Sequence, residues 1–133
     1  MAGASHIFHL AVPCRDLSEA QQFYVDGLGA RLARQYDDRI TLEFFGDQLV
    51  CHLAPGKIDP APEIYPRHFG VTFRERRDFE QVLARVREQE LTFFKEPFTR
   101  FEGLQEEHTT FFLKDPSNNI IEFKHYHDAR MIY

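Results

Sequence analysis

The sequence has no tryptophan and only two cysteines, Cys14 and Cys51, in 133 residues. Two cysteines without a C-x-x-C pair do not make a disulfide framework, so the reducing cytoplasm is the expected compartment. No apolar run approaches the roughly 20 residues that a membrane helix needs, and the N-terminus lacks the pattern of a signal peptide. The sequence therefore predicts a cytoplasmic protein with no membrane segment.

Basic residues are also few, since 16 Lys and Arg stand against 21 Asp and Glu and give a net charge of −5. Without a contiguous basic stripe, nucleic acid is not an expected partner. The chain is instead 43% hydrophobic and contains 14 phenylalanines, which predicts a globular core built around Phe. Its length suits one domain that buries roughly two thirds of its unfolded surface.

The pattern of apolar residues predicts one order of elements twice: a strand, a helix and three strands. The first module, about residues 6–54, should hold strands at 6–13, 31–36, 40–45 and 48–53. Its helix should begin at Asp16, with Glu19 completing a capping box, and end at Gly27 or Gly29. Residues 55–66 contain four prolines and are interpreted as a linker.

The second module, about residues 67–127, repeats this order. Its strands should lie at 68–73, 91–95, 108–114 and 120–126, with a helix over Phe79 to Val86 and a loop at 98–107. The sequence thus predicts a duplicated β-α-β-β-β unit of the α+β class. One helix covers one face of a four-stranded sheet, so the other face must meet its counterpart or a ligand. The residues expected between helix and sheet are Leu17, Tyr24, Phe79, Leu83 and Val86.

The last strand places Glu122 among isoleucines, on the same face as Ile120, Lys124 and Tyr126. A carboxylate in such surroundings is costly to bury without a partner, which could be an arginine or a metal ion.

Histidines favour the metal. His9 and His68 lie on the first strands of the two modules, and His52 lies on the last strand of module one, where module two has Glu122. A lone histidine in a strand is more often a core or rim residue, but four potential ligands at matching positions indicate a metal site. His125 and His127 could also chelate, although they lie on the face away from Glu122.

Two motifs then suggest a family. Phe23-Tyr24 with Leu28-Gly29 on the first helix, and Asp115-Pro116 followed by Ile121-Glu122-Phe123 at the end, resemble the vicinal oxygen chelate superfamily. This group includes glyoxalase I, bleomycin-resistance proteins and extradiol dioxygenases, and the resemblance covers residues 7–126. It implies paired modules that form a cup-shaped sheet, with the helices outside. It also implies a divalent metal bound by His9, His68 and Glu122.

Within the superfamily, this ligand set is similar to single-domain relatives of biphenyl-2,3-diol dioxygenases. The resemblance implies Fe(II), with Mn(II), Ni(II) or Zn(II) possible, and a small substrate that binds through neighbouring oxygens. His52 would be the acid–base residue or a fourth ligand. Phe112 and Tyr126 would contact substrate, but Phe112 stands where those enzymes carry a substrate-orienting tyrosine, which counts against ring cleavage.

Two other functions stay open from the sequence. One is a glyoxalase-type isomerase or lyase, in which the metal stabilises an enediolate as a Lewis acid. The other is a metal-free binding protein whose phenylalanines stack on a flat ligand. Open sheet edges and an open cup further predict a homodimer.

Overall fold

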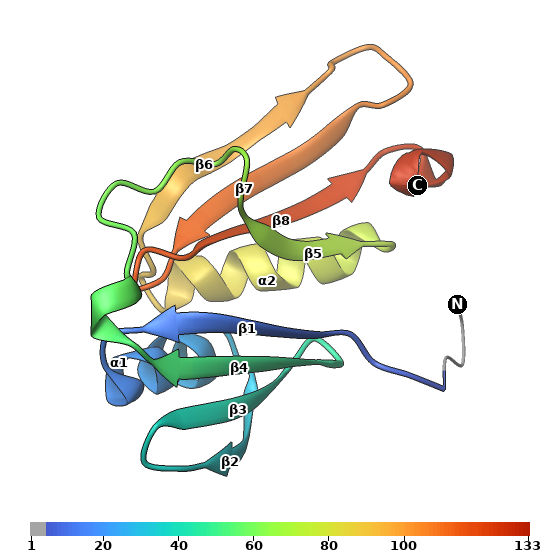
Figure 1. The fold of residues 1–133 in the computed structure, drawn as a ribbon. Helices are drawn as coiled ribbons and strands as arrows, with labels where there is room; N and C mark the ends of the chain where they lie inside the picture. Colours follow the sequence, from blue (N-terminus) through green and yellow to red (C-terminus); the bar gives the residue numbers. More distant parts are fainter. Residues whose placement is uncertain (1–4) are drawn as a thin grey trace. The chain divides into compact units, whose positions relative to one another are not determined.

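The computed structural model describes residues 5–133 and shows two compact units, each built on one four-stranded sheet (Figure 1). The first unit is the chain up to Pro60 together with Pro116–Asn119, and the second is Ala61–Asp115 together with Ile120–Tyr133. Among the described residues, no helix is long and apolar enough to cross a membrane.

The first unit has the sheet order β1-β4-β3-β2, in which β1 runs parallel to β4 and the other pairs are antiparallel. Helix α1 continues directly into a π-helical segment, η1, and its packing partners are β3 and β4. The elements are β1 (His9–Cys14), α1 (Leu17–Gln21), η1 (Gln22–Gly27), β2 (Arg31–Gln35), β3 (Arg39–Phe44), β4 (Asp47–Leu53) and η2 (Pro55–Lys57).

The second unit repeats this topology with the order β5-β8-β7-β6, and β5 runs parallel to β8. Its elements are β5 (Phe69–Phe73), α2 (Arg76–Glu88), β6 (Phe93–Arg100), β7 (His108–Lys114), β8 (Ile120–Tyr126) and η3 (Ala129–Ile132). The two β-α-β-β-β modules of an α+β fold, expected from the sequence, are confirmed.

Three predicted boundaries were wrong. Strand β1 begins at His9, and β5 begins at Phe69, so that His68 immediately precedes its strand. The predicted loop at 98–107 is also too long, because β6 continues through Phe98 to Arg100. Pro97 lies within β6, which is an edge strand with register shifts on both sides of Lys95, and such positions tolerate proline.

The start of α1 was predicted correctly in part. The Asp16 side chain accepts a hydrogen bond from the Glu19 amide at 2.8 Å, as a helix cap should. The Glu19 carboxylate does not close the capping box and instead binds the Arg15 guanidinium at 2.7 Å and 2.9 Å. This charged, two-point partner is stronger than a single backbone amide.

Phenylalanines fill the space between α2 and its sheet. Phe111 lies at the centre of this core, with ring centroids 5.5 Å from Phe79 and 5.3 Å from Phe123. Tyr24, Phe79, Leu83 and Val86 are buried as expected, whereas Leu17 is only half-buried because it is the first residue of α1. Helix α2 packs on β5 and β8 from this side. The side chain of Glu122 therefore lies on the opposite face of the sheet.

Candidate metal centre

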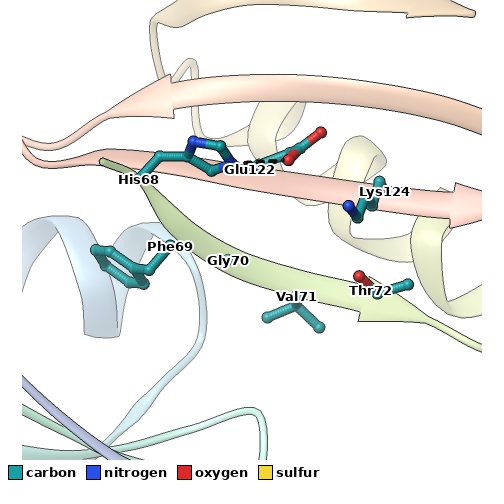
Figure 2. Close-up of a pocket in the computed structure, with 7 residues that line it drawn as sticks. All are labelled: His68, Phe69, Gly70, Val71, Thr72, Glu122 and Lys124. Carbon is teal, nitrogen blue, oxygen red and sulfur yellow. Dashed lines mark hydrogen bonds and ion pairs between the residues drawn. The ribbon is translucent and has the colours of Figure 1, made fainter. Parts of the chain in front are cut away.

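The candidate site lies on that opposite face, where β8 runs between β5 and β7 (Figure 2). The register puts Glu122 directly opposite Gly70 on one side and Phe112 on the other. A pocket of about 210 Å³ opens beside it. The residues that line the pocket are His68, Phe69, Gly70, Val71, Thr72, Glu122 and Lys124.

Glu122 is 7% exposed, and both of its carboxylate oxygens have partners. The Thr110 hydroxyl donates to Oε2 at 2.6 Å, while Oε1 lies 3.1 Å from Nε2 of His68. The partner that a buried carboxylate requires is therefore a histidine and a threonine, not an arginine.

The ring of His68 is held in one orientation from its other side. Its Nδ1 donates to the carbonyl oxygen of Ile64 at 2.7 Å, because a carbonyl can only accept. In the neutral ring, Nε2 then carries no hydrogen, and its lone pair faces the carboxylate oxygen of Glu122. Two acceptors at this distance require a proton or a cation between them.

This arrangement fits a divalent metal ion. Ligating histidines characteristically donate their second N–H to a backbone carbonyl or carboxylate, which leaves the other nitrogen for the metal. Ligands 2.0–2.2 Å from an octahedral ion, at right angles to each other, are about 3.0 Å apart. The distance of 3.1 Å between Nε2 of His68 and Oε1 of Glu122 matches that separation.

Gly70 is required for the close approach of β5 to β8 at this point. A Cβ at residue 70 would collide with the backbone carbonyl oxygen of Glu122, and it would lie 2.7 Å from its carbon and 2.8 Å from its nitrogen. Any residue other than glycine would push β5 away from β8. The absence of a side chain therefore helps to set His68, two residues earlier, against Glu122.

Phenylalanines border the pair on the β7 side. The Phe112 ring is 1% exposed and meets the His68 ring edge to face, with centroids 5.5 Å apart. Phe98 stacks on Phe112 at 6.5 Å. Further along β8, Tyr126 is half-buried and its ring lies 4.7 Å from that of His108. Phe112 can exclude water here, but it has no hydroxyl to orient a substrate.

Two other predicted residues lie in the first unit. His9 is exposed on β1 opposite Gln48, and His52 is exposed on β4 opposite Pro13. Both point to the same sheet face, but they are four residues apart in register, which is about 13 Å along the strands. His52 is therefore poorly placed to share one metal ion with His9.

The expected equivalence of His52 and Glu122 was wrong by two residues. Glu122 pairs with Gly70, two residues after His68, and Val50 pairs with Ala11, two residues after His9. Val50 is thus the counterpart of Glu122. By the same register, His52 is the counterpart of Lys124, because these two residues pair with Pro13 and Thr72.

The structure therefore brings His68 and Glu122 together in the second unit. His9 and His52 belong to the first unit. Neither unit, over residues 5–133, holds a group of three or more His, Cys, Asp or Glu side chains suited to a metal ion. His125 and His127 are engaged on the other side of β8, by the Phe73 carbonyl and the Glu107 carboxylate.

Sequence reasoning missed Thr110. It is fully buried and lies two residues before Phe112, so strand alternation puts it on the Glu122 face. That alternation, counted from Phe112, was the available signal.

Thr110→Val should weaken divalent-metal binding by about 10- to 100-fold, the usual effect of losing an outer-shell hydrogen bond. The valine keeps the shape of threonine but leaves Oε2 of Glu122 buried without its donor. Calorimetric titration with Zn(II) measures the change, and Thr109→Val is the matched control, because Thr109 is a half-buried threonine on the opposite face of the same strand. Unchanged affinity in Thr110→Val would show that the hydroxyl does not orient the carboxylate for a metal.

The fold agrees with the family comparison. A model of the Glyoxalase/Bleomycin resistance protein/Dioxygenase superfamily matches residues 6–123. The chain belongs to this superfamily. No functionally curated protein matches the sequence.

Solved structures extend the comparison. A glyoxalase/bleomycin resistance protein/dioxygenase from Alicyclobacillus acidocaldarius is 54% identical over 100% of both chains, with a TM-score of 0.96. A lactoylglutathione lyase from Agrobacterium tumefaciens is 16% identical over 92% of this chain and 95% of that one, with a TM-score of 0.67. The fosfomycin resistance protein FosX from Listeria monocytogenes is 12% identical over 97% and 99%, with a TM-score of 0.74. The last two share the fold alone.

Proposed function

We propose that the chain is a divalent-metal-dependent enzyme that binds two neighbouring oxygens of a small substrate. The observation that carries this proposal is the His68–Glu122 pair, in which Nε2 of an imidazole held at Nδ1 lies 3.1 Å from a buried carboxylate oxygen. A proton could fill that position, but the ligand-like tautomer and spacing favour a metal. His9 is the proposed third ligand.

Each of the neighbouring residues has a part in this proposal. The Ile64 carbonyl and the Thr110 hydroxyl would hold the two ligands in orientation. Phe112 and Phe98 would keep water from the β7 side of the pair. The bound metal would supply a Lewis acid for the substrate oxygens. Two histidines and one carboxylate are typical of Fe(II), with Mn(II), Ni(II) or Zn(II) as alternatives.

The first reaction to test is a dioxygenase-like ring opening. In that reaction a ring C–C bond beside a diol breaks and both atoms of O₂ enter the product, so no reductant is consumed. The test loads the protein with Fe(II) without air, measures bound metal, and then adds catechol and O₂. Stoichiometric metal with O₂ uptake and ring-opened product supports the proposal, and bound Fe(II) without O₂ uptake rejects this reaction.

Phe112 favours a second candidate, an isomerase or lyase, because a phenylalanine there offers no hydroxyl to a diol. This function needs no O₂. A lactoylglutathione lyase assay under anaerobic conditions, with Zn(II) or Ni(II) in the protein, separates it from ring opening. A protein that binds no metal but retains flat aromatic ligands would instead belong with the metal-free binding proteins.

We also propose a homodimer in the cytoplasm. Each four-stranded sheet ends in edge strands, and such edges favour pairing with another chain. Light scattering at micromolar concentration should give twice the chain mass of 15.7 kDa. A mass equal to that of one chain would contradict the prediction.

A further inference from the structure

Lys124 lines the same pocket as His68 and Glu122. It follows Glu122 by two residues on β8, so both side chains point to one face of the sheet, about 6.6 Å apart along the strand. Figure 2 shows Lys124 beside Thr72 of the neighbouring strand β5, and the register pairs these two residues. Thr110 pairs with Lys124 from the other side.

The ammonium group of Lys124 has little to neutralise it. Over residues 5–133 no carboxylate forms an ion pair with Lys124, and its Nζ lies 5.2 Å from the centroid of the Tyr126 ring. The carboxylate of Glu122, two residues away on the same face of β8, is oriented toward Thr110 and His68 instead. Lys124 is also half-buried, and burial without a counter-charge is unfavourable for an ammonium.

We propose that Lys124 is a specificity-determining residue that binds a carboxylate of the substrate. The proposal rests on the proposed function, since the neighbouring oxygens of the same molecule would bind at His68 and Glu122. A single lysine matches the single charge of a carboxylate, whereas a phosphate dianion generally gathers several donors. The pocket volume of about 210 Å³ suits a small acid of this kind.

The spacing between Lys124 and Glu122 predicts where the carboxylate lies on the substrate. Lys124 is the next residue after Glu122 on this face of β8. The substrate carboxylate should therefore lie on the opposite side of the substrate from its chelating oxygens, not next to them. Among dihydroxybenzoates, the 3,4-isomer has this arrangement, and the 2,3-isomer has its carboxylate beside the diol.

The test uses the Zn(II)-loaded full chain, in which bound diols are not oxidised. Calorimetry compares 3,4-dihydroxybenzoate, 2,3-dihydroxybenzoate and catechol for three proteins: wild type, Lys124→Met and Lys114→Met. Lys114 is an exposed lysine of β7 that does not line the pocket, so its variant removes the same charge elsewhere. Methionine retains most of the apolar stem of lysine.

Wild type and Lys114→Met should bind 3,4-dihydroxybenzoate about 10- to 100-fold more tightly than catechol, as expected for a hydrogen bond to a charged group. Lys124→Met should lose this preference and bind catechol as wild type does. Equal preference in wild type and Lys124→Met, or tighter binding of the 2,3-isomer, would overturn the proposal. Failure of the wild type to bind Zn(II) at all would overturn the proposed function itself, and the metal titration shows this separately.

Discussion

Glu122→Gln should lower divalent-metal affinity by more than about 100-fold, beyond the effect of changing an outer-shell residue. The glutamine keeps the size of the side chain and removes its charge. Its amide oxygen can accept from Thr110 and its NH₂ group can donate to the His68 Nε2 lone pair, so the pocket should stay folded. The lost property is the anionic oxygen that faces a cation.

Two measurements check this result. Calorimetry with Zn(II) gives the affinity, and thermal unfolding with and without metal gives the stabilisation. A ligand at 100 times its Kd stabilises a fold by about 2.7 kcal/mol, and Glu122→Gln should lose most of this gain. Glu96→Gln changes an exposed carboxylate on β6 and should retain it. Wild-type affinity in Glu122→Gln would make the ligand assignment wrong.

The same comparison of wild type with Glu122→Gln distinguishes a metal site from a plain ion pair between His68 and Glu122. If a proton normally lies between His68 and Glu122, the wild type should show little stabilisation by Zn(II), and Glu122→Gln should resemble it. The two cases thus differ in the metal dependence of the wild type and not in the folded structure of the variant.

The modules were predictable because their signals are local. Alternating apolar residues, glycine turns and the Asp16 cap each act within a few residues, and each unit repeats them. Glu122 stood out for the same reason, as a carboxylate flanked by strong strand formers. Its pairing with His68 was implied by the family resemblance, and the two side chains lie 3.1 Å apart.

The remaining features depend on contacts between distant segments. The pairing of β1 with β4 decides that Val50, not His52, is the counterpart of Glu122, and a shift of two residues leaves the alternation pattern unchanged. The carbonyl of Ile64 carries no side-chain signal, yet it determines which nitrogen of His68 faces Glu122. The need for Gly70 likewise arises only from the backbone of another strand.

His52 is the residue with the second large expected effect. It is exposed on β4, and its counterpart in the other module, Lys124, lines the pocket with His68 and Glu122. We propose that His52 moves protons and does not bind the metal. His9 pairs with Gln48, four residues before His52 on β4, so His52 lies too far along the strands to share a metal ion with His9. An imidazole that is not coordinated can accept and donate a proton near neutral pH.

His52→Ala should therefore keep wild-type metal affinity and slow turnover by about 10²–10⁴-fold on the substrate that the wild type converts. Removing an exposed side chain should leave stability within about 0.5 kcal/mol, and His6→Ala, another exposed histidine, is the matched control. Added imidazole should restore part of the rate only if a proton carrier was lost. Loss of metal together with activity would identify His52 as a ligand and favour the glyoxalase-type site. If neither quantity changes, His52 has no part in the chemistry, because a proton-transfer residue cannot be removed without slowing the step that it serves.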